Sequence, residues 1–481
     1  MSPRELVFGK ATKNQVIASI LPMKKNIRCL LMILCLGQLG LLHAQGYQAL
    51  HGSSYTGSTS AYNNPASPVN YLQNWELTFL AVQAKATTNA ATMQDFNTIK
   101  ITDGYFSRFA HANQDMGLLN FLYKIDERKA LTVNFRMRNY LHAKSQPFNY
   151  IDSVTTTMNR FFVVNRNTPF IEAFGTHSGW LELGLNYSQV LHETDHDRLT
   201  GGLTLQLQKG ISGATVKVNK LSYLEQKNGT DTTYTFTGGG GSLAYGDSYE
   251  SEDMKDFLKR SMLSLGISMG IEYLVYQPGA NTGGSTPNYD WKIGLSLMDL
   301  GANVYRSGSS STSFSNPNTT ISDVTLDNKL SGANTLGDVA DSLATIFTNT
   351  AGVASNFKIS NPTRLILNVD RNLGNNFFVN GELSMNFFST SSYKHLYTRE
   401  LNLFTLTPRW ETAEFGVYLP MQYTTQGQFW FGAAVKLGPL VVGMHNLGML
   451  KKDTEINGGG YMLLSIHPFR SKKAISKLDC F

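Results

Sequence analysis

The sequence predicts an all-β protein: a closed antiparallel transmembrane β-barrel of about 14 strands, with an N-terminal arm or plug and long extracellular loops. Three observations support this fold class. Apolar and polar residues alternate along many segments, several segments run about ten residues or more, and long and short connections alternate along the chain. A strand that crosses a bilayer needs about 9–11 residues, whereas strands of soluble sheets cluster near 5–6 residues.

The composition agrees with a barrel and excludes a helical membrane protein. Only 16% of the 481 residues are charged, whereas about 25% are charged in an average globular chain. Gly, Tyr and Phe number 43, 22 and 27, which suits strands and tight turns more than helices. Outside the leader, no stretch of the sequence approaches the ~20 apolar residues that a membrane-spanning helix needs.

The first element is a leader at residues 1–44. Basic residues precede a short apolar run at 29–42, and Ala44 offers a small residue for cleavage. These three features describe a secretory signal peptide, so we expect cleavage after Ala44 and export to the bacterial outer membrane. Because Met23 resembles a natural start, residues 1–22 are expected to be an extension that the natural protein lacks.

The leader also explains the net charge. It holds six basic residues and one acidic residue, so it contributes +5 of the formal +6. The remaining chain is nearly neutral, which removes the reason to expect nucleic acid as a partner. Beyond the leader, Cys480 is the only cysteine, so no internal disulfide is expected.

The second element, residues 45–74, is small and polar and contains the motif Asn64-Pro65-Ala66. Proline interrupts strand pairing, so this segment is not expected to form a regular membrane strand. Two interpretations stay open, a periplasmic arm and a plug inside the lumen.

The barrel itself is expected at residues 75–467, followed by a short periplasmic tail at 468–481. Leu131, Val133 and Phe135 illustrate the pattern, because each is followed by a polar residue. Successive strand residues point to opposite faces, so each segment has one apolar and one polar face. A soluble sandwich makes the same alternation, but a polar face that mixes charges with Gly and Ser favours a lumen. We expect strands at 75–85, 116–125, 130–142, 180–192, 198–209, 261–276, 289–304, 362–371, 376–388, 401–409, 414–424, 427–437, 440–446 and 458–467.

Connection lengths give an independent argument. Short periplasmic turns and longer outer loops are typical of outer-membrane barrels. Within the longest connection, Leu336, Val339, Leu343 and Phe347 have helical spacing, which predicts a short helix. The long connections are expected at 86–115, 143–179, 210–260 and 305–361.

A first resemblance involves the motif of the second element. Asn64-Pro65-Ala66, shortly after the leader, resembles the N-terminal signature of the long-chain fatty-acid transporter barrels and of barrels tied to type IX secretion. This resemblance implies an outer-membrane barrel and, for the first family, passage of hydrophobic solutes.

A second resemblance covers nearly the whole chain beyond the leader. Asp299-Leu300-Gly301 ends one strand, an Asn-Pro-Thr-Arg-Leu motif at 361–365 opens the next, and 437–443 form a late hairpin. In this order the motifs resemble a family of uncharacterised outer-membrane proteins from Bacteroidota, a domain of unknown function. The family often has Trp just beyond the Asp-Leu-Gly motif, where this chain has Tyr305. The resemblance implies location and architecture, and it implies no catalytic residues.

Two motifs have residue types that occur in chemical sites. Residues 266–270 match G-x-S-x-G, but a nucleophile elbow needs a strand-to-helix turn and Ser268 lies in the middle of a strand. His192 and His196 have acidic neighbours that could bind a metal, but a tight hairpin does not offer helical spacing. We therefore expect no catalytic residue, no metal site and no cofactor.

Charged residues on the polar face are the remaining candidate site. Arg or Lys facing lipid at mid-bilayer costs roughly 2–4 kcal/mol, so parity directs these charges into the lumen. We favour an ion-pair network that fills the barrel over a ring that binds or filters solute, and both interpretations stay open. The candidate lumen charges are Lys124, Arg136, Arg138, Glu182, Glu272, Lys292, Arg364, Glu382 and Lys436.

Two functions from different classes fit these features. The first is a non-enzymatic, porin-like channel or transport barrel for small solutes, hydrophobic ones included. The second is a structural or partner-binding barrel, such as a secretion accessory or surface scaffold, and it rests on the long loops. The expected partners are outer-membrane lipid and either a small hydrophobic solute or a protein, and not nucleic acid.

Overall fold

The computed structural model describes most of the chain beyond the leader. The predicted signal peptide at 1–44 and the predicted tail at 468–481 lie outside the described residues. Within the described part, no helix is both long enough and apolar enough to cross a membrane. The described residues are 47–95, 98–155, 157–229, 231–250, 260–277, 287–387, 396–451 and 453–467.

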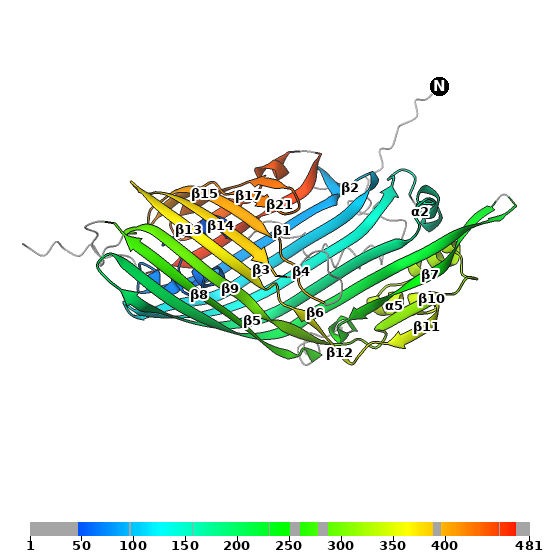
Figure 1. Ribbon diagram of the computed structural model, residues 1–481, viewed down its shortest axis with the longest axis horizontal. Helices are drawn as coiled ribbons and strands as arrows, with labels where there is room; N and C mark the ends of the chain where they lie inside the picture. Colours follow the sequence, from blue (N-terminus) through cyan, green and yellow to red (C-terminus); the bar gives the residue numbers. More distant parts are fainter. Residues whose placement is uncertain are drawn as a thin grey trace, which may run out of the picture.

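The strands close into an antiparallel barrel (Figure 1). The seam closes because β1 (Trp75–Asp95) pairs with β3 (Gly104–Asp126) on one side and with β21 (Thr454–Ile466) on the other. β16 and β17 are the two halves of one interrupted wall strand, and β18 and β19 are the two halves of another. When each pair is counted as one strand, the wall has the fourteen strands that the sequence predicts. The other wall strands are β4 (Lys129–Tyr150), β5 (Ile171–Glu193), β6 (Asp197–Asn228), β8 (Leu263–Tyr276), β9 (Tyr289–Arg306), β13 (Arg364–Gly374), β14 (Phe377–Asn386), β15 (Leu403–Glu411), β16 (Phe415–Tyr418), β17 (Met421–Thr424), β18 (Phe429–Phe431), β19 (Ala433–Leu437) and β20 (Leu440–Met444).

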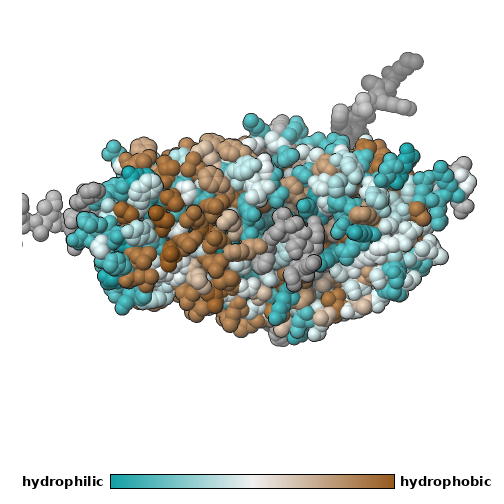
Figure 2. All heavy atoms as spheres, viewed as in Figure 1, coloured by the Kyte–Doolittle hydropathy of each residue, from teal (hydrophilic) through white to brown (hydrophobic). Residues whose placement is uncertain are grey.

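The predicted alternation sets the two faces of the wall. Leu131, Val133 and Phe135 on β4 are exposed, whereas Thr132 and Asn134 between them are buried. The exposed apolar side chains gather in a brown zone over the barrel, with hydrophilic residues on either side along the long axis (Figure 2). An apolar belt bounded by polar ends is the outer surface that a bilayer requires.

Aromatic rings mark the end of the barrel that carries the short turns. Tyr187, Tyr273 and Trp291 are exposed there, and the guanidinium of Arg371 lies 4.6 Å from the centre of the Trp291 ring. Tyr and Trp favour the membrane–water interface because their rings are apolar and their tips are polar. These rings therefore mark a membrane–water boundary near the short turns.

A charge in the apolar belt should destabilise the barrel. Leu205 on β6 is 52% exposed in the middle of this belt, and Leu205→Arg is expected to cost about 2–4 kcal/mol of folding free energy in lipid. Urea titration of barrels folded into liposomes measures the loss. The matched control is Leu224→Arg, further along the same strand, where a 61% exposed side chain lies in the outer hairpin. Equal losses in both variants would contradict the assignment of the belt to lipid.

The four long connections contain more strand than the sequence predicts. β4 continues to Tyr150, β5 begins at Ile171, and β6 continues to Asn228 before it turns back into β7 (Asp231–Tyr245). β2 (Thr98–Ile101) pairs with β1 in the first connection. These extensions were missed because a strand that has left the lipid has no apolar face, so its sequence lacks the alternation.

An outer lobe grows from these extensions, at the right-hand end of Figure 1. β7 pairs with β10 (Thr312–Pro317), and β10 pairs with β11 (Phe347–Gly352). Phe162, Phe236 and Phe314 form part of an aromatic cluster in this lobe. The lobe also contains α2 (Met158–Val164), α4 (Asp323–Ser331) and α5 (Leu336–Ala344).

The predicted helix in the longest connection is α5. Leu336, Val339 and Leu343 pack against the lobe as their spacing predicts, but Phe347 begins β11 instead of extending the helix. Thr335 and Asp338 form a capping box at the helix start. Hydrogen bonds from the backbone of Asn334 and Thr335 hold the pKa of Asp338 below its usual value.

Candidate functional site: the filled lumen

Residues 47–74, from here on the lumen segment, lie inside the barrel (Figure 1, dark blue). The segment forms three short turns, η3 (Gln48–Leu50), η4 (Ser58–Tyr62) and η5 (Ser67–Asn70). Tyr47 packs in one apolar cluster with Tyr418 and Tyr461 of the wall. Packing against wall residues therefore fixes the position of this segment in the lumen.

Wall carboxylates hold the beginning and the middle of the lumen segment. Glu76 on β1 accepts hydrogen bonds from the backbone N–H groups of Gly57 (3.1 Å) and Ser58 (2.8 Å), and from the Ser58 hydroxyl (3.0 Å). Glu411 on β15 accepts a hydrogen bond from the Ser53 hydroxyl at 2.7 Å. Hydrogen bonds to a charged acceptor contribute about 1.5–3 kcal/mol each, so these contacts anchor the segment without covalent links.

Two further carboxylates anchor the segment, one on β14, the neighbour of β15, and one on β8. Glu382 on β14 lies 2.8 Å from His51 Nδ1 and accepts a hydrogen bond from the Asn63 amide at 3.0 Å. Glu272 on β8 accepts a hydrogen bond from the Ser67 hydroxyl at 2.6 Å. Strands on several sides of the barrel thus hold one segment.

Glycines of the wall make room for the Asn64-Pro65-Ala66 motif. The Asn64 amide donates to the Ile271 carbonyl (2.9 Å), and a Cβ added at Gly270 would lie 2.1 Å from Asn64 Oδ1. A Cβ added at Gly202 would lie 1.9 Å from the Pro65 carbonyl oxygen. The small residues on the lumen face therefore form the seat of the motif.

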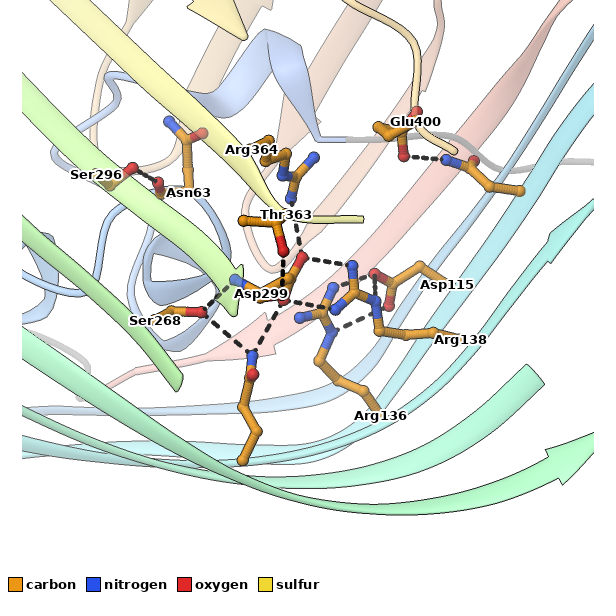
Figure 3. Close-up of polar contacts among 12 residues, drawn as sticks. Asn63, Asp115, Arg136, Arg138, Ser268, Ser296, Asp299, Thr363, Arg364 and Glu400 are labelled. Atoms are coloured by element: carbon orange, nitrogen blue, oxygen red, sulfur yellow. Dashed lines mark hydrogen bonds and ion pairs between the residues drawn. The ribbon is translucent and has the colours of Figure 1, made fainter. Parts of the chain in front are cut away.

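Beyond the lumen segment, a buried ion network crosses the middle of the lumen (Figure 3). Arg138 binds Asp299 through two hydrogen bonds of 2.8 Å, and its side chain is fully buried. Arg136 pairs with Asp115 and lies 3.5 Å from Glu182. With Arg364, 4.0 Å from Asp299, the network has three cations and three carboxylates, so its charges balance. Balance matters because an unpaired charge at such a buried position is costly.

A backbone bend presents the carboxylate of Asp299. Its φ is +60°, and Gly301 has a φ of +152°, where a Cβ would come within 2.6 Å of the Leu265 carbonyl. The Ser268 hydroxyl accepts a hydrogen bond from the Asp299 N–H at 2.9 Å. Ser268 is part of the G-x-S-x-G match and lies within β8, where it helps to hold the bend.

After this bend the end of β9 leaves β13 and pairs with β12 (Asn356–Ser360). Tyr305 is buried on this part, and its hydroxyl lies 2.7 Å from the Ser178 hydroxyl. Its ring packs where a Cβ at Gly213 would be 2.7 Å away. The Asp299-Leu300-Gly301 motif thus marks a change of strand partner.

A third group of charges lies near the periplasmic turns. The Arg409 side chain is fully buried, with Nε 2.8 Å from Glu411 and Nη1 2.5 Å from Asp370. Lys292 donates to the Gly52 carbonyl and to the Ser54 hydroxyl of the lumen segment. This group joins the wall to the lumen segment at its first turn.

The nine candidate lumen charges separate into three places. Arg136, Arg138, Glu182 and Arg364 meet in the central network, and Glu272, Lys292 and Glu382 contact the lumen segment. The other two ammonium groups lie near the end with the short turns and also contact the lumen segment: Lys124 donates to the Tyr71 carbonyl (3.3 Å), and Lys436 lies 4.8 Å from the centre of the Tyr55 ring.

Several residues of the site were missed by the sequence reasoning. Asp115 precedes the predicted start of its strand by one residue, and Glu411 follows a predicted end by two. Glu411 has the parity of the lumen face, so a longer predicted strand would include it. Asp115 does not share the parity of Lys124, because a bulge at Leu118 and Leu119 shifts the alternation along β3, so parity could not identify it. Asp370 and Arg409 also have the parity of the lumen face within their predicted strands. Their charge on that polar face was the feature that could have identified them. Glu400 lies in a connection, where parity gives no information.

The alternative chemical sites do not assemble. His192 and His196 lie at the turn between β5 and β6. Among the described residues, no group of three or more His, Cys, Asp or Glu side chains is arranged to hold a metal ion.

Comparisons with known proteins identify a family but no characterised relative. Residues 67–445 match the model described as "Family of unknown function (DUF5723)". No curated protein matches the sequence.

Solved structures similar to this chain include a FadL homologue, a toluene transporter and a monoaromatic hydrocarbon channel. A Pseudomonas aeruginosa FadL homologue has 11% identity and a TM-score of 0.41, with 87% of this chain and 95% of that chain covered. The Ralstonia pickettii toluene transporter TbuX has 11% identity and a TM-score of 0.41, with 86% and 94% covered. A mutant of the monoaromatic hydrocarbon channel TodX has 10% identity and a TM-score of 0.41, with 88% and 96% covered.

Proposed function

We propose that this chain, which belongs to the family of unknown function DUF5723, is a non-enzymatic transport barrel of the bacterial outer membrane for small hydrophobic solutes. In the proposal, residues 47–74 are the plug, and solute passes after the plug leaves its seat. The signal peptide at 1–44 would direct export, and the apolar belt would face the outer-membrane lipid.

The observation that carries the proposal is the way the lumen segment is held. Its anchors on Glu76, Glu272, Glu382 and Glu411 are hydrogen bonds from hydroxyl, amide, imidazole and backbone groups. Such bonds can be exchanged for water, because a hydrated carboxylate and a hydrated Ser or Asn are both stable. Apolar packing also holds the segment, because Tyr47, Leu50 and Tyr62 lie in one cluster with wall residues, so the polar anchors are the contacts that water can replace.

The solute class comes from the residues of the plug. Asn64-Pro65-Ala66 resembles the signature of barrels that pass long-chain fatty acids, and this motif lies in the glycine seat of the wall. The proposed solutes are therefore hydrophobic molecules rather than ions or sugars.

A reversible lock tests the proposal. The hydroxyl oxygens of Ser58 in the lumen segment and Thr78 in β1 are 3.0 Å apart, so S58C/T78C should form a disulfide in a C480S background. Uptake of radiolabelled oleate and toluene is measured in cells that carry the barrel in their outer membrane. Oxidation should reduce uptake to the level of cells without the barrel, and reduction should restore it.

The control is C480S alone, which should be insensitive to oxidation. Uptake that is the same in the oxidised and reduced S58C/T78C variant, with the disulfide verified on a gel, would reject the plug. No uptake by any form of the barrel would reject the solute class.

A second function, binding of a protein at the cell surface, is favoured by one observation. β11 is at the edge of the outer lobe, where Thr348 to Gly352 are exposed. An exposed edge strand can pair with an extended segment of a partner. A stable partner that co-purifies with a barrel lacking solute uptake would support this alternative.

A further inference from the structure

A second part of the chain also crosses the lumen. Residues 396–402, from here on the strap, belong to the connection between β14 and β15, and Tyr397 to Leu401 are at most 8% exposed. The strap reaches β4, which is seven strands away from β15 in either direction around the ring. A connection that contacts the opposite wall spans the lumen.

The far end of the strap is held by a buried ion pair. Glu400 Oε1 lies 2.6 Å from Lys85 Nζ on β1, and both side chains are almost fully buried. The other carboxylate oxygen accepts a hydrogen bond from the Asn113 amide of β3 at 2.6 Å. Arg399 Nη1 lies 3.1 Å from His142 Nε2 on β4. Three neighbouring strands therefore hold two adjacent residues of the strap.

The near end is held by a backbone bridge and by apolar packing of Leu396 against the cluster that contains Tyr305 and Phe357. The Thr398 N–H donates to the Ser360 carbonyl at 2.8 Å, and the Ser360 N–H donates to the Leu396 carbonyl at 3.2 Å. This short bridge joins the strap to the end of β12, beyond the bend at Asp299. Release of the far end would leave the strap attached at this bridge.

The strap lies in a different layer from the lumen segment. Along β3, a Cβ at Gly117 would contact Tyr62 of the lumen segment, Asp115 is in the ion network, and Asn113 binds the strap. Successive lumen-facing residues of β3 therefore contact three layers in turn: the lumen segment, the ion network and the strap. The strap is the outermost layer.

We infer that the strap is a second gate, on the outer side of the lumen, and that Lys85–Glu400 is its latch. The inference rests on the proposed transport function and adds its regulation: solute crosses only when the latch is released and the lumen segment has also left its seat. The two closures have separate anchors, so each can open while the other stays shut.

The latch can be tested by cysteine labelling. Thr398 is 2% exposed, so T398C in a C480S background should resist a membrane-impermeant maleimide added to intact cells. Lys85→Glu places a second carboxylate against Glu400. The repulsion between the two should release the strap, so that T398C becomes labelled. The charge swap K85E/E400K restores an attractive pair and should restore protection. Protection that persists in K85E, or labelling that is equal in K85E and the swap, would overturn the latch.

Ion conductance in planar bilayers then tests whether two gates act in series. Gly202→Val is expected to displace the lumen segment from its glycine seat. Potassium chloride current should stay near the wild-type level in K85E alone and in G202V alone, and should rise strongly in K85E/G202V. A double variant that conducts no more than G202V alone would overturn the second gate. Unheated gel mobility verifies that each variant is a folded barrel.

The two proposals fail in different ways. Conductance and labelling do not depend on a hydrophobic solute. If both give the expected results but the barrel takes up neither oleate nor toluene, the proposed function is rejected and the strap remains supported as a gate. Normal uptake with T398C protected in K85E would reject the strap and keep the function.

Discussion

Replacement of Arg138 by Met is expected to lower the free energy of unfolding by about 3–5 kcal/mol, the cost of breaking a buried ion pair by removing one partner. Arg138 is fully buried, binds Asp299 through two hydrogen bonds, and lies 3.4 Å from Glu182. Its loss leaves three carboxylates with only two guanidinium groups. Urea unfolding of the barrel in lipid, followed by tryptophan fluorescence, measures the loss.

The matched control is Arg128→Met. Arg128 also pairs with a glutamate, Glu193 at 3.4 Å, but its side chain is 55% exposed at a periplasmic turn. Exposed pairs contribute about 0–1 kcal/mol, so this variant should be nearly neutral. R138M/D299N removes one charge of each sign and should recover part of the stability, because Asn tolerates the positive φ of this position. Equal effects of R138M and R128M would contradict the buried network.

Gly202→Val is expected to expel the lumen segment from the barrel while the wall stays folded. A Cβ at this position would lie 1.9 Å from the Pro65 carbonyl oxygen and 2.6 Å from the Ala66 nitrogen, and both are backbone atoms that cannot rotate away. Val is favourable in a strand, so the substitution should disturb the position of the Asn64-Pro65-Ala66 motif and not the strand itself. Limited proteolysis in liposomes should then cut within residues 47–74, which the barrel should protect in the wild type.

Gly201→Val is the control for this variant. The adjacent residue points to the outer face, where its Cβ would meet only the flexible end of Leu191, at 2.9 Å. G201V should keep the lumen segment protected from protease. Protection in both variants would show that the glycine seat does not position the segment, whereas cleavage in both would indicate a general loss of folding.

The barrel was predictable from the sequence because lipid imposes a strict rule on one face of each strand. Leu131, Val133 and Phe135 follow that rule, and the order and number of strands follow from such segments. Strand residues beyond the lipid do not have to be apolar on one face. The continuation of β4 to Tyr150 and of β6 to Asn228 therefore lacks the alternation that would have predicted it.

The contents of the lumen were less predictable, for a different physical reason. Ser53, Asn63 and Ser67 can be satisfied by water as well as by wall carboxylates, so the sequence left an arm and a plug equally open. Parity identified Arg138 but not its partner, because the bend that presents Asp299 depends on a local backbone conformation. Glu400 was missed since its role depends on a connection that crosses the barrel.

The seam between the first and last strands has a consequence for folding kinetics. Leu77 pairs with Ile466, so the wall cannot close until nearly the whole described chain has been made and ordered. Contacts of such high sequence separation carry a large loop-closure cost and slow the approach to the native state. Until that seam closes, the edges of β1 and β21 both present unpaired backbone groups. The slowest step of assembly is therefore expected to be the pairing of these two strands, and changes at Leu77 or Ile466 should affect the folding rate more than equivalent changes within a local hairpin.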